Sequence, residues 1–164
     1  MASISLPYYA DAATLPANLP TRDEIESSQD VFCDQFARKV VGVGHYFIVK
    51  YGLDVDLMEG ETILFIQQET SVPVPRIYAL FKDPINNKAY IIMERIVGRN
   101  LESEWPLLSQ IQKDAIAIQL RASLDEMRKL QSPGGYCKCP LLDNVFWTGN
   151  TVDTIAGHLR EKQS

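Results

Sequence analysis

Long hydrophobic runs, a surplus of positive charge and a paired set of cysteines are all missing from this 164-residue sequence. No apolar stretch approaches the roughly 20 residues that cross a bilayer. The first residues carry neither a basic start nor an apolar block, so we expect no secretory signal. Sixteen basic residues stand against 21 acidic ones, which gives a net charge of −5. Because nucleic acids and anionic membranes attract concentrated positive charge, we expect neither as a partner.

Cysteine and histidine are too scarce for a disulfide framework or a zinc centre. The cysteines are Cys33, Cys137 and Cys139, and the two histidines are His45 and His158. Cys137 and Cys139 could supply half of a zinc site, but no second cysteine pair completes the four ligands. We therefore expect free thiols, a cytoplasmic protein and no bound metal.

The length predicts about one domain. Residues 1–20 contain three prolines and predict an extended N-terminal arm that can pack on a body or on a partner chain. Residues 21–150 hold the periodic patterns and predict a single domain. Residues 151–164 are interpreted as a C-terminal tail.

Helical and strand patterns alternate along this domain. Capping boxes at Thr21 and Ser109 predict helix starts, and β-branched and aromatic residues around two glycines predict a hairpin. The expected elements are a helix over 22–36, a hairpin over 39–51, a helix over 56–70, strands over 76–82 and 89–96, and a helix over 109–131. Neighbouring strands with short connections favour a mainly antiparallel sheet, hence the α+β class.

Four strings resemble the fungal proteins of the aminoglycoside phosphotransferase family, whose fold is protein-kinase-like. They are residues 47–52 (Phe-Ile-Val-Lys-Tyr-Gly), 54–59 (Asp-Val-Asp-Leu-Met-Glu), 72–78 (Val-Pro-Val-Pro-Arg-Ile-Tyr) and 90–101 (Tyr-Ile-Ile-Met-Glu-Arg-Ile-Val-Gly-Arg-Asn-Leu). The resemblance covers about residues 20–150. It implies that 21–150 fold like the N-terminal lobe of a kinase-like phosphotransferase, followed by a long helix.

The same resemblance implies roles for five residues. Lys50 is the strand lysine that contacts nucleotide phosphates, and Glu59 is the helix carboxylate that pairs with it. Met93, Glu94 and Arg95 form the hinge whose backbone meets an adenine. The residues alone leave a second interpretation open, in which Lys50 and Glu59 are an ion pair that braces the strand against the helix.

The sequence departs from the family in its catalytic loop. Family members carry a His-Gly-Asp loop with a downstream Asn and a magnesium-binding Asp. Here His158 is followed by Leu159, and Asp153 has no partner Asn. The resemblance is thus to a shortened form that lacks the catalytic second lobe, and we expect this chain alone not to be a competent kinase.

Two functions from different classes follow. The first is a repurposed small-molecule tailoring enzyme of fungal secondary metabolism, an isomerase or cyclase that works without a cofactor. Lys50, Tyr46 and Arg95 could stabilise an enolate or oxyanion, while Glu59 or His45 moves a proton. His45 could equally be a solvated turn residue.

The second function is a non-catalytic pseudokinase fragment that binds a nucleotide or a protein partner. It is expected to be a homo-oligomer, joined through residues 109–131 or through the arm. A truncated phosphotransferase of ordinary activity is a third interpretation.

Overall fold

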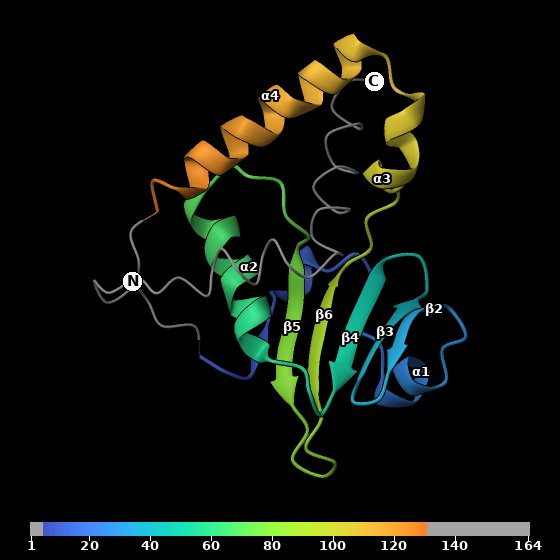
Figure 1. Cartoon of the computed structure of the whole chain (residues 1–164). Helices are drawn as coiled ribbons and strands as arrows, with labels where there is room; N and C mark the ends of the chain where they lie inside the picture. The colour runs from blue at the N-terminus through green and yellow to red at the C-terminus, as the bar shows by residue number, and fades with distance from the viewer. Residues whose placement is uncertain (1–4, 131–164) are drawn as a thin grey trace. The chain divides into compact units, whose positions relative to one another are not determined.

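In the part of the chain that the structure describes, six strands pair in an antiparallel sheet in the order β1-β5-β6-β4-β3-β2 (Figure 1). A computed structural model of the chain describes residues 5–130. The strands are β1 (Tyr8–Tyr9), β2 (Val31–Gln35), β3 (Arg38–Val43), β4 (Phe47–Gly52), β5 (Ile77–Lys82) and β6 (Ala89–Glu94). The predicted α+β class and antiparallel arrangement are confirmed.

Four α-helices and two short 3-10 helices accompany the described sheet. They are α1 (Arg22–Glu26), α2 (Leu57–Glu69), α3 (Leu101–Glu104), α4 (Gln110–Met127), η1 (Ala12–Thr14) and η2 (Trp105–Leu107). Both predicted capping boxes are present, at the starts of α1 and α4. Within residues 5–130, no helix is both long and apolar enough to span a bilayer.

The chain divides into two compact units, each described by itself. The sheet unit holds 5–64 and 75–95 of the described residues, and the helical unit holds 65–74 and 96–130. The predicted tail over 151–164 and the Cys137–Cys139 pair lie outside the described residues.

The predicted helix over 22–36 is wrong in its second half. Helix α1 ends at Glu26, and residues 31–35 form strand β2. The hydroxyl of Ser27 donates to the Asp23 carbonyl, and the hydroxyl of Ser28 donates to the Gly42 carbonyl at 2.6 Å. Serine hydroxyls that bond to the backbone compete with helix propagation, and Ser28 also ties the chain to β3.

One face of the sheet packs against α1 and the N-terminal arm. Alternate residues Phe47, Val49 and Tyr51 of β4 point to this face and are buried in its core. The arm contributes a strand, because Tyr8 and Tyr9 pair with β5 and give the sheet its sixth member. Further along the arm, partly buried apolar side chains pack against the same core.

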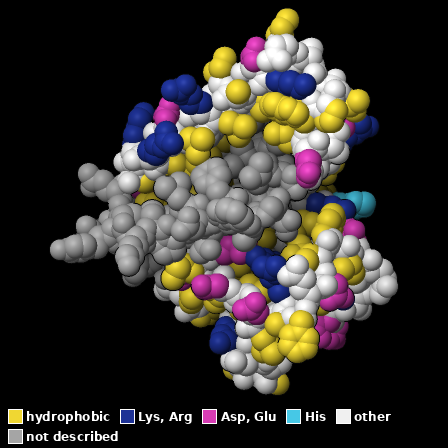
Figure 2. All heavy atoms as spheres, in the orientation of Figure 1, with side chains coloured by type: hydrophobic (Ala, Val, Ile, Leu, Met, Phe, Trp, Pro, Cys, Tyr) yellow, Lys and Arg dark blue, Asp and Glu magenta, His cyan; other side chains and the backbone are white. Residues whose placement is uncertain are grey.

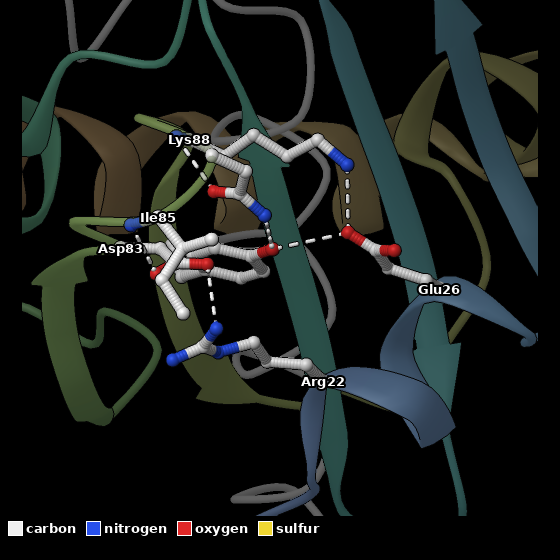
Figure 3. Close-up of polar contacts among 7 residues, drawn as sticks. Arg22, Glu26, Asp83, Ile85 and Lys88 are labelled. Atoms are coloured by element: carbon white, nitrogen blue, oxygen red, sulfur yellow. Dashed lines mark hydrogen bonds and ion pairs between the residues drawn. The ribbon is translucent and has the colours of Figure 1, made fainter.

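A polar network joins α1 to the turn between β5 and β6 (Figure 3). Nη1 of Arg22 lies 2.7 Å from Oδ2 of the fully buried Asp83. The Lys88 ammonium and the Tyr90 hydroxyl both donate to Oε1 of Glu26, at 2.6 and 3.2 Å. The network therefore holds α1 to the β5–β6 hairpin.

The contact between Glu26 and Lys88 makes stability depend on pH. The hydrogen bond from Lys88 lowers the pKa of Glu26, and the same bond raises the pKa of Lys88. The contribution of Glu26 is therefore present above its unfolded-state pKa and is lost as pH falls through the lower folded-state value. The contribution of Lys88 is present at neutral pH and is lost as pH rises through its raised pKa.

We expect the wild-type chain to lose more stability than Lys88→Met between about pH 5 and pH 3. The reason is that the variant lacks the bond that Glu26 loses on protonation. Thermal melts at a series of pH values measure the two slopes. Lys82→Met, which changes an exposed lysine of the same hairpin, should keep the wild-type slope. Identical acid slopes for wild type and Lys88→Met would contradict the expectation.

The helical unit has a small core of its own. Buried Ile66, Val72 and Met127 pack together, with partly buried leucines of the α4 end around them. The Glu126 carboxylate accepts from the backbone N–H and the hydroxyl of Ser71, at 2.5 and 2.9 Å. The hydrogen bond from the Ser71 backbone, and to a smaller extent the one from its hydroxyl, lowers the pKa of Glu126.

Candidate functional site

Lys50 lies on β4, an interior strand of the sheet. Its register partners are Val40 on β3 and Ile91 on β6. Because side chains alternate along a strand, Lys50 points away from the face that holds Val49 and Tyr51. Its side chain is only 8% exposed.

Helix α2 brings a carboxylate to this lysine. The Asp56 carboxylate accepts from the Met58 N–H at 2.9 Å and caps the helix start, which places Glu59 in the first turn. The helix lies close to the sheet at Gly60, because a Cβ there would overlap the side chain of the buried Leu80. In Figure 1 the first turns of α2, which belong to the sheet unit, lie beside β5.

The ammonium of Lys50 and the carboxylate of Glu59 form an ion pair with a hydrogen bond. A buried ammonium is costly without a partner, so Glu59 both compensates and orients the charge. An ammonium has three donors, and Glu59 takes one of them. Lys50 can therefore present further N–H groups to anionic oxygens such as those of phosphate.

The predicted hinge residues Met93 and Glu94 end strand β6, and Arg95 follows it directly. Met93 pairs with Ile48, and both side chains lie on the Lys50 face because they are two positions from Ile91 and Lys50. The Glu94 carboxylate accepts from the Arg76 N–H at 3.1 Å, so this side chain ties the end of β6 to the start of β5.

His45 and Tyr46 lie in the turn between β3 and β4, and both are exposed. The Arg95 N–H donates to the Tyr46 carbonyl at 2.8 Å, so the structure brings these two predicted residues together. Lys50 lies three residues beyond the strand start at Phe47, which is about 10 Å of extended chain. The structure therefore does not bring His45 beside Lys50. The catalytic and binding roles of these residues stay predictions.

Two contributors to this region were not predicted. Gly60 carries a sequence signal, because a glycine inside a helical pattern often marks a close approach of two elements. Asp30, which pairs with Arg95 at 2.6 Å, carries none, because its partner is 65 positions away. Among residues 5–130, no three His, Cys, Asp or Glu side chains gather as a metal-binding group.

Strand order, the intervening helix and the Lys50–Glu59 pair together define a class. An antiparallel sheet with a strand lysine, paired to a glutamate on the helix that follows, is the arrangement of kinase N-terminal lobes. The sheet unit is thus similar to the N-terminal lobe of kinase-like phosphotransferases, with the long helix α4 later in the chain.

A comparison with solved structures finds a similar protein. The chain is similar to the aminoglycoside phosphotransferase APH(2")-IIia in its complex with GDP and kanamycin, with a TM-score of 0.50 and 19% sequence identity. The likeness covers 64% of this chain and 38% of that one, so this chain spans well under half of its length. No protein-family model and no curated protein matches the sequence.

Proposed function

We propose that the sheet unit binds the phosphate groups of a nucleoside phosphate through Lys50, as the phosphate-contacting half of a phosphotransferase-type site. The observation that carries the proposal is the Lys50–Glu59 pair, a buried ammonium held in one orientation by a helix carboxylate. The similar structure was solved with GDP, which supports a guanine nucleotide as the first ligand to test, and the resemblance stated above adds an adenine nucleotide as the second. The proposal covers binding, because phosphoryl transfer also needs metal-binding carboxylates.

The tailoring-enzyme hypothesis has less support from this geometry. This hypothesis requires Glu59 or His45 to move the proton. The Glu59 carboxylate is hydrogen-bonded to Lys50, and the exposed His45 lies in the turn before β4. An isomerase or cyclase reaction on a small-molecule substrate, its place in fungal secondary metabolism and a cytoplasmic location stay predictions.

The predicted homo-oligomer also stays a prediction. Hydrophobic side chains are exposed along η2 and α4, and Figure 2 shows yellow side chains on the surface of this part of the chain. The exposed residues are Trp105, Leu107, Ile111 and Ile118. An interface through the predicted helix over 109–131 would include the last two.

Calorimetric titration with GDP, GTP and ATP, with and without magnesium, tests the proposal. We expect saturable binding by the wild-type chain. We expect Lys50→Met to weaken it about 10- to 100-fold, because hydrogen bonds to charged groups contribute about 1.5–3 kcal/mol. Methionine keeps the length of the buried stem. Glu59→Gln should weaken binding less, because it removes the orientation of the ammonium and leaves its charge.

Lys88→Met is the matched control, since it removes an equal charge from another ion-paired lysine of the same unit. It should bind nucleotide as the wild type does. No saturable binding by a folded wild-type chain, or equal affinities for wild type and Lys50→Met, would overturn the proposal.

A further inference from the structure

Arg95 links the end of β6 to two other segments of the sheet unit. Its Nη1 donates to Oδ2 of Asp30 at 2.6 Å and to the Gly44 carbonyl at 3.0 Å. Its guanidinium carbon lies 5.6 Å from the ring centre of Phe32, over the first residues of β2. Its backbone N–H bonds to the Tyr46 carbonyl. One residue thus joins β6, the β3–β4 turn and the start of β2.

The space for this ion pair is built into the strands. The Gly42 N–H donates to the Asp30 carbonyl at 2.8 Å, which draws the segment before β2 against β3. A Cβ at Gly42 would overlap both the Asp30 carboxylate and Nη1 of Arg95. The ion pair therefore occupies the position that a side chain would take at any residue larger than glycine.

The face of the sheet that carries Lys50 is more accessible toward the same end of β6. Beside Lys50, the neighbours Val40 and Ile91 are buried, whereas Ile48 and Met93 are only half-buried. A nucleoside phosphate is elongated, so a ligand whose phosphates meet Lys50 can place its base on Ile48 and Met93. Apolar side chains with nearby backbone groups are typical of the part of a site that takes a flat, uncharged ring.

We propose that Arg95 is a positioning residue that fixes the end of β6 and thereby sets the affinity of the site for the base of a nucleotide. The inference rests on the proposed nucleotide binding, and it assigns Arg95 a role other than direct contact with substrate. The Arg95 and Asp30 side chains are 27% and 48% exposed. Ion pairs with this exposure contribute little to global stability, so the effect of Arg95 falls on local geometry.

Comparing GDP with inorganic pyrophosphate separates the two roles. Pyrophosphate offers the phosphate groups without a base. We expect Arg95→Met to weaken the binding of GDP about tenfold and to change the affinity for pyrophosphate less than about twofold. A tenfold loss of GDP affinity lies within the range observed for residues that act on a site through other residues. Lys50→Met should weaken both ligands. Arg95→Lys should recover only part of the GDP affinity that Arg95→Met loses. The lysine keeps the positive charge, but its ammonium cannot reproduce the planar guanidinium over Phe32.

Asp30→Asn is the milder second variant, since it keeps the shape and removes the charge partner. It should weaken GDP in the same selective way, and the double variant should lose no more than Arg95→Met alone. Lys39→Met is the control, because Lys39 and Asp34 form an ion pair at 3.3 Å within the β2–β3 hairpin. It should leave both affinities unchanged.

The outcomes distinguish this inference from the proposed function. If the wild-type chain binds neither ligand, both the proposed function and this inference are wrong. A wild-type chain that binds GDP while Arg95→Met and Asp30→Asn bind both ligands normally, or lose both equally, overturns the positioning role and leaves Lys50 as the phosphate contact. Thermal melts of every variant identify one that is unfolded at the titration temperature.

Discussion

Gly52→Ala is expected to destabilise the protein by at least about 3 kcal/mol. Gly52 ends β4 with a φ of +149°, a conformation that side chains rarely adopt. A Cβ there would also overlap the backbone carbonyl of Ala37. That carbonyl cannot move freely, because it accepts from the Asp54 N–H at 3.1 Å. The substitution therefore adds a backbone collision to backbone strain.

Gly44→Ala is the matched control. Gly44 also has a positive φ, +61°, but no atom would lie within 4 Å of an added Cβ. Only the left-handed conformation opposes alanine there, which costs about 1–2 kcal/mol. Urea unfolding of both variants measures the difference. Equal losses for the two glycines would show that the contact with Ala37 is unimportant.

Arg22→Met is expected to cost about 2–3 kcal/mol of unfolding free energy. The carboxylate of Asp83 is fully buried, whereas the Arg22 side chain is 47% exposed. Oδ1 of Asp83 accepts from the Ile85 N–H at 3.0 Å. Oδ2 has no regular hydrogen bond within the described residues, so the nearby Arg22 guanidinium compensates its charge. Removal of Arg22 leaves a buried carboxylate without its counter-charge.

A second substitution tests this reason. In the Arg22→Met background, Asp83→Asn should recover part of the loss, because a neutral amide is cheaper to bury than an unpaired carboxylate. A double-mutant cycle from urea unfolding gives the coupling energy. A loss below about 0.5 kcal/mol for Arg22→Met, the ordinary effect of a surface substitution, would contradict the expectation.

Local signals in the sequence predicted much of the fold. Capping boxes at Thr21 and Ser109 specify helix starts through residues only a few positions apart, and both are confirmed. The predicted hairpin turn around Gly42 and Gly44 is confirmed at Gly44, which has a positive φ, whereas Gly42 lies within strand β3. The region after Glu26 was mispredicted because an apolar pattern over two short elements resembled one long helix. There the deciding bond, from Ser28 to the Gly42 carbonyl, spans 14 positions.

The candidate site was predicted in part, and by a different route. The resemblance to kinase-like phosphotransferases implied that Lys50 pairs with Glu59, and the structure pairs them. The grouping of Arg95 with Asp30 depends on the sheet order, which places β2 and β6 on either side of β3 and β4. Composition and local spacing carry no information on such pairings.

Strand β1 has a consequence for the order in which the protein is made. Tyr8 pairs with Leu80, which is 72 positions later in the chain. At about 5–20 residues per second, the ribosome needs several seconds to deliver the partner strand after the tyrosines emerge. During that interval the two tyrosines of β1 lack the β5 backbone with which they pair. The earliest part of the sheet to be synthesised is therefore among the last to find its place, as expected for contacts distant in sequence.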